Sequence, residues 1–283
     1  MFATALVALD MSDARLAVLD CIPQLQAWGV RRIVLAHVLR KGLPPNPQWG
    51  QRQYVEQDLR ELAERLRLQL PASEIDTVVL EASAPAEGLL SLGEKHSANL
   101  IVVGSRSHSH TESLFLGNFA RDVIRKAERP TLLLALVPGT EPGAPMHAVC
   151  ENMLRHVLLA TDFSRHATPA ETAAHLLAER HVPIDCLHVI QTQSRLAMPL
   201  WPTMAEAALS ELGAGLHKVG SPVSAALLAE GEPAEQIART AQTHNHSLVI
   251  VGKHGQNWIE GRLIGSTAAR ICEIAGRPVL VMP

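Results

Sequence analysis

Val157-Leu-Leu-Ala-Thr-Asp162-Phe-Ser164, near the middle of the chain, repeats the pattern of Ala5-Leu-Val-Ala-Leu-Asp10-Met-Ser12 near its start. Both stretches are apolar runs that end in Asp-x-Ser, which predicts a buried strand followed by a helix capped by Ser12 or Ser164. Further pairs follow in the same order: Ile33–Val38 with Ile184–Val189, Ala84–Glu87 with Glu232–Glu235, Leu100–Gly104 with Leu248–Gly252, and Arg129–Leu134 with Arg277–Met282. Two unrelated domains would not share these stretches in one order, so the chain is predicted to contain two copies of one module.

The composition indicates how each copy folds. Apolar residues make up 47% of the chain but aromatic residues only 3%, which is typical of parallel strands covered by helices on both faces. Strands that alternate with helices predict parallel pairing through right-handed crossovers. The densest Pro/Gly cluster, Pro138–Pro145, lies where the repeat predicts a boundary. We therefore expect domains at residues 1–137 and 153–283, with residues 138–152 as a linker.

Charge and cysteine content restrict the expected partners and location. With 25 basic and 28 acidic residues the formal net charge is −3, so nucleic-acid binding is not expected. The charge-free stretches are too short to span a bilayer and no signal peptide is expected, which predicts a cytoplasmic protein that does not bind membranes. The cysteines contain no CxxC pair and are predicted to be reduced, mostly buried thiols; they are Cys21, Cys150, Cys186 and Cys272.

The second copy contains a candidate phosphate-binding loop. Gly252-Lys-His-Gly255 is followed by nine residues and then by Gly265-Ser266-Thr267. The loop begins where an apolar strand ends and closes where a new helix begins. Glycine lets the backbone turn sharply and approach a ligand, the N–H groups at a helix start face an anion, and the hydroxyls add donors. His254, inside this loop, is expected either to touch a phosphate or to be exposed.

Asp162 ends the first strand of the same copy. Ligands of open α/β sheets bind outside the carboxyl ends of the strands, where the strand order reverses. If the first and fourth strands are neighbours, Asp162 faces the phosphate-binding loop across that crevice and can bind the nucleoside part of a ligand. The alternative is that Asp162 only caps the following helix, a role that Ser164 already fills.

These residues resemble the universal stress protein family, specifically its tandem-domain members, over nearly the whole chain. The resemblance implies two Rossmann-like (adenine nucleotide alpha hydrolase-like) domains, each with five parallel strands ordered 3-2-1-4-5. ATP-binding members of that family carry the G-2x-G-9x-G-S/T motif. By resemblance, Asp162 and Val189 would contact the ribose and adenine. The residues that would hold the phosphates are Gly252, Gly255, Gly265, Ser266 and Thr267, and His254 is added as a candidate cofactor-binding residue because of its place in the loop.

The first copy departs from this motif. It has Gly104-Ser-Arg-Ser107, nine residues, and then Gly117-Asn118, so that a serine replaces the second glycine and an asparagine replaces the hydroxyl residue. Ser107 resists a positive φ, at a cost on the order of 1 kcal/mol if that conformation is needed, whereas Asn118 is a good helix cap. We expect the same fold with weakened or absent ATP binding; binding by both copies stays open. Asp10 and Val38 are retained.

Histidines suggest metal sites, but none has a recognised ligand spacing, so we predict no protein-bound metal; a metal could accompany a bound nucleotide. The groups are His108 with His110, His147 with Cys150 and His156, and His244 with His246. His37 and His188, which end strands in both copies, are expected to form structural hydrogen bonds. No G-x-S-x-G elbow and no Walker A pair occurs, so no catalytic residues are predicted.

The resulting hypothesis is a stress-response protein that binds ATP in its C-terminal domain for sensing or regulation. One alternative is an adaptor that acts on an unknown protein partner, in which the copies form a pseudo-dimer through Thr131–Leu136 and Val279–Met282. Another is a weak ATPase or a metal-dependent hydrolase that uses loop histidines. Monomer and homodimer both stay open.

Overall fold

The computed structural model describes residues 1–42, 52–105, 116–139, 144–191, 200–256 and 263–283. The chain divides into two compact units, Met1–Val149 and Cys150–Pro283. We call them unit 1 and unit 2. The bounds of the expected domains and linker stay a prediction, and residues 140–143 of that linker lie outside the described residues.

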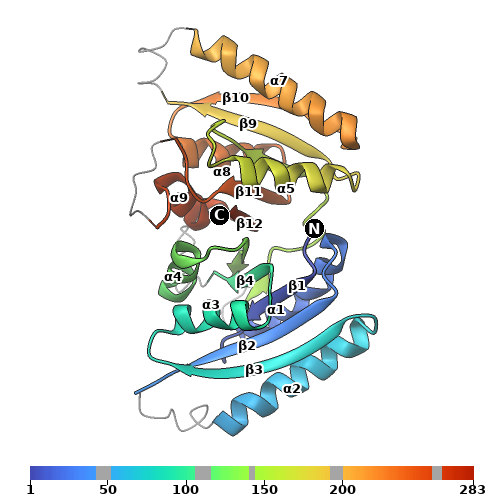
Figure 1. Ribbon diagram of the computed structural model, residues 1–283, viewed down its shortest axis with the longest axis vertical. Coiled ribbons are helices and arrows are strands. Elements are labelled where there is room, and N and C mark those ends of the chain that lie inside the picture. Colours follow the sequence, from blue (N-terminus) through green and yellow to red (C-terminus); the bar gives the residue numbers. More distant parts are fainter. Residues whose placement is uncertain (43–51, 106–115, 140–143, 192–199, 257–262) are drawn as a thin grey trace. The chain divides into compact units, whose positions relative to one another are not determined.

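Unit 1 contains one parallel sheet with the strand order β3-β2-β1-β4-β5, as predicted (Figure 1). Its elements are β1 (Thr4–Ala8), α1 (Ala14–Cys21), the short 3-10 helix η1 (Ile22–Trp28), β2 (Arg32–Arg40), α2 (Arg52–Gln69), β3 (Glu74–Ala82), α3 (Pro85–Lys95), β4 (Leu100–Gly104), α4 (Asn118–Lys126) and β5 (Thr131–Leu134). Two further short strands, β6 (Leu136–Val137) and β7 (His147–Ala148), pair antiparallel.

Unit 2 repeats this order as β10-β9-β8-β11-β12, which is again 3-2-1-4-5 along the chain. Its elements are β8 (Val157–Ala160), α5 (Thr168–Ala178), β9 (Ile184–Ile190), α7 (Trp201–Val219), β10 (Ala226–Glu230), α8 (Pro233–Thr243), β11 (Leu248–Gly252), α9 (Ser266–Ile274) and β12 (Val279–Met282). Helix α5 packs against α7 and α8 packs against α9, and the α8–α9 pair corresponds to the α3–α4 pair of unit 1.

The strand register is also the same in both units. Ala5 pairs with Ile33 and Leu100, and its counterpart Val157 pairs with Ile184 and Leu248. The pairing of β4 with β5 is likewise repeated by β11 with β12. Central strands β1, β4, β8 and β11 are almost entirely buried, because helices cover both faces of each sheet. The repeat seen in the sequence is therefore a repeat of structure, residue by residue.

The cysteine prediction is half wrong. Cys186 and Cys272 are buried free thiols, and burial raises the pKa of each to about 12. Cys21 and Cys150, in contrast, are each disulfide-bonded. Because neither residue belongs to a CxxC pair, their sequence spacing could not reveal this; only the folded chain brings a distant cysteine within bonding distance.

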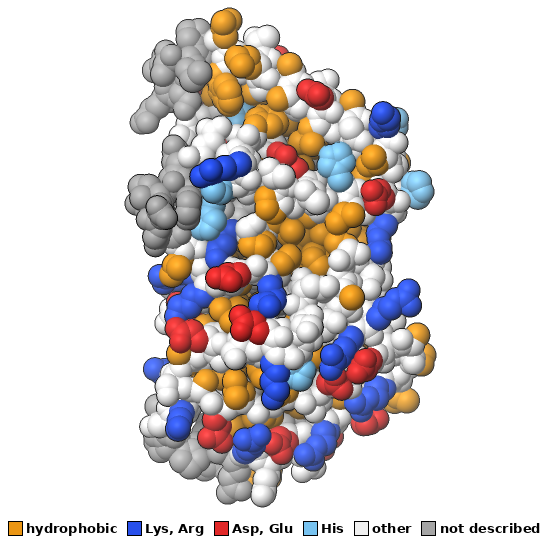
Figure 2. All heavy atoms as spheres, in the orientation of Figure 1, with side chains coloured by type: hydrophobic (Ala, Val, Ile, Leu, Met, Phe, Trp, Pro, Cys, Tyr) orange, Lys and Arg blue, Asp and Glu red, His pale blue; other side chains and the backbone are white. Residues whose placement is uncertain are grey.

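Charged side chains are mixed over the surface. On the face shown in Figure 2, Lys and Arg side chains are interspersed with Asp and Glu. Ion pairs such as Arg32 with Asp76 (2.7 Å) and Lys126 with Glu87 (2.7 Å) belong to this pattern. None of the helices in the described part of the chain is both long enough and apolar enough to cross a membrane.

Candidate nucleotide-binding site

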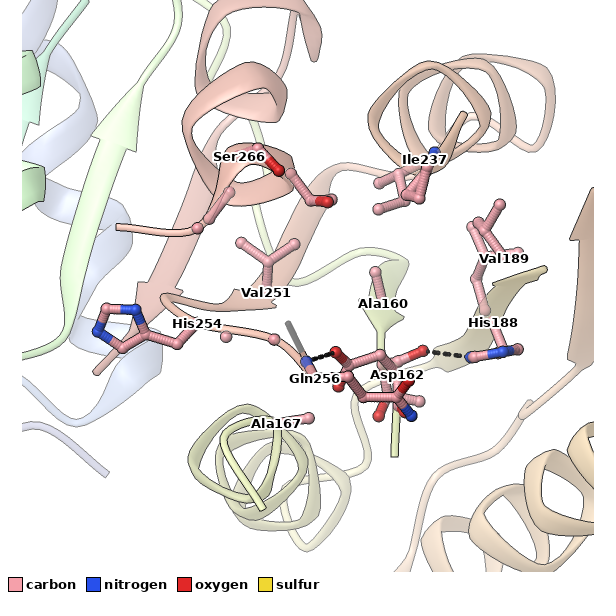
Figure 3. Close-up of a pocket in the computed structure, with 18 of the residues that line it drawn as sticks. Ala160, Asp162, Ala167, His188, Val189, Ile237, Val251, His254, Gln256 and Ser266 are labelled. Atoms are coloured by element: carbon pink, nitrogen blue, oxygen red, sulfur yellow. Dashed lines mark hydrogen bonds between the residues drawn. The ribbon is translucent and has the colours of Figure 1, made fainter. Parts of the chain in front are cut away.

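A cavity of about 310 Å³ opens at the carboxyl ends of the strands of unit 2 (Figure 3). It lies where the strand order reverses, since β8 has β9 on one side and β11 on the other. Ala160 and Val251, from β8 and β11, together with Ile237 of α8, form an apolar part of its wall. All the residues predicted for the site line this cavity: Asp162, Val189, Gly252, His254, Gly255, Gly265, Ser266 and Thr267.

The predicted phosphate-binding loop leads into the start of helix α9. Gly252 is the last residue of β11, and Gly265 is the N-cap residue of α9. The N–H of Gly265 donates to the carbonyl of Lys253 (2.9 Å), which holds the two ends of the loop together. The N-cap residue makes no side-chain hydrogen bond, so the first-turn N–H groups of α9 can bind an anion. Residues 257–262 of the loop lie outside the described residues.

The glycines of this loop are needed for close packing and not for a positive φ. Gly252, Gly255 and Gly265 do not have φ in the left-handed region. A Cβ at Gly252 would lie 2.8 Å from the backbone oxygen of His166, and a Cβ at Gly255 would lie 2.6 Å from Oδ2 of Asp162. The condition under which Ser107 would be strained, a positive φ, is therefore not met at the equivalent Gly255 of unit 2, where the constraint is steric contact with Asp162.

Asp162 connects the two sides of the cavity (Figure 3). Its Oδ2 accepts a hydrogen bond from the N–H of Gln256 (2.7 Å), and its backbone oxygen accepts one from the Gln256 side-chain amide (2.8 Å). Its Oδ1 accepts the N–H of Ser164 (3.0 Å). A carboxylate offers about four acceptor positions, so Asp162 can hold the loop and still bind a ligand hydroxyl.

Ser12 and Ser164 do not cap the helices as predicted. Helix α5 begins at Thr168 with Ala167 as its N-cap residue, and α1 begins at Ala14 with Asp13 as its N-cap residue. The aspartate two residues before each serine accepts the serine N–H instead, at 2.9 Å in unit 1 and 3.0 Å in unit 2. This local turn competes with helix formation and delays the helix start. Asp162 therefore does not cap helix α5; its carboxylate stabilises the turn that precedes the helix.

His37 and His188 form the structural hydrogen bonds predicted for them. Nδ1 of His188 donates to the carbonyl of Thr161 (2.9 Å), and Nδ1 of His37 donates to the carbonyl of Leu9 (2.7 Å). Burial lowers the pKa of both imidazoles more than these hydrogen bonds raise it. Each histidine is therefore a neutral group that fixes the chain after a central strand.

Three residues that line the cavity were not predicted. Trp201 begins helix α7, although the prolines Pro199 and Pro202 on either side of it are typical of a loop. Its ring lies edge-on to that of His188, with 5.8 Å between the centroids. Lys253 is buried, although it stands inside the motif as an unspecified residue. Gln256 follows the second glycine. The ring of His254 points away from Asp162 and Ala160 (Figure 3), and the residue is half-buried, so its contact with a phosphate stays a prediction.

The corresponding crevice of unit 1 is smaller, about 120 Å³. Leu136 of β6 lines it, and its Cδ1 lies only 2.7 Å from the place of a Cβ on Gly104. The Ser105 hydroxyl donates to the carbonyl of Leu134 (3.1 Å) and accepts the N–H of Leu136 (3.1 Å), which holds this segment over the crevice. Asn118 is the first residue of α4 and Gly117 is its N-cap residue, so the capping role expected of Asn118 is wrong. Ser107, His108 and His110 lie outside the described residues.

Comparison with known proteins agrees with this architecture. The profile described as Universal stress protein family matches residues 1–135 and 153–283. A universal stress protein of Thermus aquaticus is 32% identical over 141 residues, which are 47% of this chain and 99% of that protein. One from Mycolicibacterium smegmatis is 28% identical over 194 residues, which are 66% of this chain and 62% of the relative.

Solved structures support the fold over the full length. The crystal structure of a universal stress protein from Archaeoglobus fulgidus covers 99% of this chain and 97% of its own, with a TM-score of 0.71 and 18% identity. At this identity the likeness concerns the fold alone. Since the family profile matches the chain twice, in residues 1–135 and again in residues 153–283, this chain belongs to the universal stress protein family as a tandem-domain member.

Proposed function

We propose that unit 2 binds an adenine nucleotide, ATP, in the cavity at the carboxyl ends of β8 and β11. The observation that carries the proposal is the helix start at Gly265–Thr267, which lines a cavity of about 310 Å³ together with Gly252 and Gly255 of the motif. That volume is in the range of small-molecule sites, whereas the 120 Å³ crevice of unit 1 is below it.

The phosphates would lie at the start of α9. Backbone N–H groups of its first turn and the hydroxyls of Ser266 and Thr267 supply donors, and the helix dipole favours negative charge there. Gly252, Gly255 and Gly265 keep the loop backbone close to the ligand, and Lys253 is the cationic residue of the loop that lines the cavity. A divalent metal could accompany the phosphates.

The nucleoside would lie across the cavity. Asp162 offers carboxylate oxygens to ribose hydroxyls, and Val189, at the end of β9, offers apolar and backbone contact to the base. Ile237 and Val251 provide the apolar wall that a purine needs, and Trp201 closes one side. A base pocket made of aliphatic side chains with few fixed polar groups is typical of nucleotide sites.

The role that follows is sensing or regulation in the cytoplasm, with occupancy of unit 2 communicated to a protein partner. Near the proposed phosphate position, the described residues contain no carboxylate or neutral imidazole that is placed as a general base, because Asp162 is held by Gln256 and Ser164 and the His254 ring points away. Hydrolysis of ATP is therefore not part of the proposal.

Isothermal titration of ATP against the full chain tests the proposal. We expect one ATP per chain for the parent and no measurable binding for Gly265→Val, because a branched side chain would occupy the anion position. Gly117→Val is the matched control: Gly117 is the same N-cap position of α4 in unit 1, and this variant should bind as the parent does. No binding by the parent, or equal binding by both variants, would overturn the proposal.

A further inference from the structure

A second cluster of ligand-type side chains lies at the other end of the same sheet, away from the nucleotide cavity. His156 directly precedes β8, Asp185 is the second residue of β9, and His246 lies two residues before β11. All three are therefore at the amino ends of neighbouring strands. The histidine groups noted in the sequence were incomplete, since the cluster takes one residue from each of two groups and adds an aspartate between them.

Three side-chain atoms converge on one point. Oδ2 of Asp185 lies 3.0 Å from Nε2 of His156 and 3.1 Å from Nε2 of His246, and all three atoms lie within 4.8 Å of one another. A tetrahedral zinc ion with bonds of about 2.0–2.1 Å places its ligand atoms about 3.3 Å apart. The two separations that involve Asp185, 3.0 and 3.1 Å, are close to this spacing.

The surroundings hold these side chains in place. Asp185 is 4% exposed and His246 is not exposed at all. Oδ1 of Asp185 accepts the N–H of Ala225 (2.9 Å), which leaves Oδ2 directed at the histidines. The backbone N–H of His156 donates to the Ser247 hydroxyl (3.0 Å), which fixes the chain at this residue. The His156 side chain is 26% exposed and leaves a path to solvent. Hydrogen bonds of this kind to the ligating residues orient them toward a metal ion.

The repeat shows that the fold does not need this cluster. In the shared strand register, the counterparts in unit 1 are Thr4, Val34 and Ala98. Val34 and Ala98 are buried apolar residues at 0% and 2% exposure. Burying a carboxylate and an imidazole where an apolar pair suffices costs free energy, so the polar residues of unit 2 require an additional role.

We propose that His156, Asp185 and His246 bind a divalent transition-metal ion of the zinc type, with water as the fourth ligand. Two imidazole nitrogens and one carboxylate oxygen select Zn²⁺ over Mg²⁺ or Ca²⁺, which prefer oxygen ligands alone. The ion connects β8, β9 and the turn before β11. Binding therefore stabilises unit 2, and the gain in its free energy of unfolding rises with the logarithm of the metal concentration above Kd.

The test uses the full chain without a histidine tag, stripped of metal with a chelator and free of nucleotide. Zn²⁺ is titrated by calorimetry, and Co²⁺ is followed by its visible absorption, whose intensity reports tetrahedral coordination. We expect one Zn²⁺ per chain and a rise in Tm on addition of Zn²⁺. Asp185→Asn and His156→Ala should each lower affinity, on the order of 100-fold or more.

His156→Ala guards against misfolding, because this side chain is partly exposed; circular dichroism checks each variant. His244→Ala is the matched control: the His244 ring is 5.9 Å from that of His246, its side chain is exposed, and this variant should bind Zn²⁺ as the parent does. The proposal is overturned if the stripped parent binds no Zn²⁺ or if Asp185→Asn and His156→Ala bind it as the parent does. It is also overturned if Zn²⁺ does not change the Tm of the parent. That result would mean that the three side chains only form hydrogen bonds with one another.

Discussion

The two crevices of this protein have the same strand order and register but different contents. In unit 2 the space between β8 and β11 is a cavity of about 310 Å³ bordered by Lys253 and the start of α9. In unit 1 the equivalent space is about 120 Å³, and Leu136 packs into it while Ser105 stands at the Lys253 position. A conserved backbone framework therefore does not guarantee a conserved site; residues that follow the sheet decide whether the crevice is open.

The two units also differ in their buried residues at the amino ends of the strands. Unit 2 buries Asp185 and His246 there, and unit 1 buries Val34 and Ala98. At the amino ends, a buried carboxylate and imidazole of unit 2 thus correspond to buried apolar side chains of unit 1. These two contrasts are the basis for proposing both ligand sites in unit 2.

The largest effect on this comparison should come from Gly255→Ala. The new Cβ would lie 2.6 Å from Oδ2 of Asp162 and would displace the carboxylate from the N–H of Gln256. Loss of this charge-assisted hydrogen bond should weaken ATP binding on the order of 10- to 100-fold, measured by calorimetry. Gly215→Ala is the control, because its Cβ would meet only a His175 ring atom at 3.5 Å. Unchanged affinity in Gly255→Ala would show that the Asp162 contact does not shape the site.

Leu136→Ala tests what fills the crevice of unit 1. Leu136 is 2% exposed, so its truncation should destabilise unit 1 by about 2–4 kcal/mol, measured by hydrogen exchange of the β4 and β5 amides. ATP stoichiometry should stay at one per chain, because Ser105 supplies no positive charge. Leu68→Ala, at a position 86% exposed, should change stability by less than about 0.5 kcal/mol. A second bound ATP in Leu136→Ala would contradict the view that unit 1 lacks phosphate-binding groups.

A smaller effect is expected from Gly93→Ala, which gives unit 1 the residue of unit 2. Gly93 of α3 corresponds to Ala241 of α8, since Pro85 and Pro233 open these helices. The added Cβ would meet Leu6 and Ile101 at 3.7 and 3.9 Å, which are ordinary contacts. Because alanine favours helix more than glycine, unit 1 should gain about 0.5–1 kcal/mol, measured by urea unfolding. Destabilisation would mean that the two helices pack differently.

The smallest effect concerns Cys272, the counterpart of the buried Ile124 in α4. Burial raises the pKa of its thiol to about 12, so at pH 8 only about one molecule in 10⁴ carries the reactive thiolate. Native protein should therefore show no iodoacetamide labelling at Cys272 by peptide mass spectrometry, while urea-unfolded protein is labelled fully. Rapid native labelling would show that α9 opens much more often than α4.

The sequence alone predicted the tandem repeat and the candidate loop, because these depend on apolar periodicity and on residues close together in the chain. The strand order was implied by the resemblance to the universal stress protein family. The sequence did not predict Trp201 in the cavity, since Pro202 beside it suggested a loop although proline is tolerated in the first helical turn. The sequence also did not reveal why the loop needs glycine at positions 252 and 255. Their requirement comes from Asp162 and His166, about ninety residues away in the chain.

The sequence therefore determined that the chain has two copies of one module. The buried strands and turns of each copy follow from local patterns such as Val157–Ser164 and its counterpart. Only the tertiary structure decided the contents of each module. It placed Leu136 in one crevice, left the other open, and brought His156, Asp185 and His246 from three strands to one point. Parallel pairing aligns the ends of strands that are distant in the chain, so sites at those ends depend on contacts that no local pattern contains.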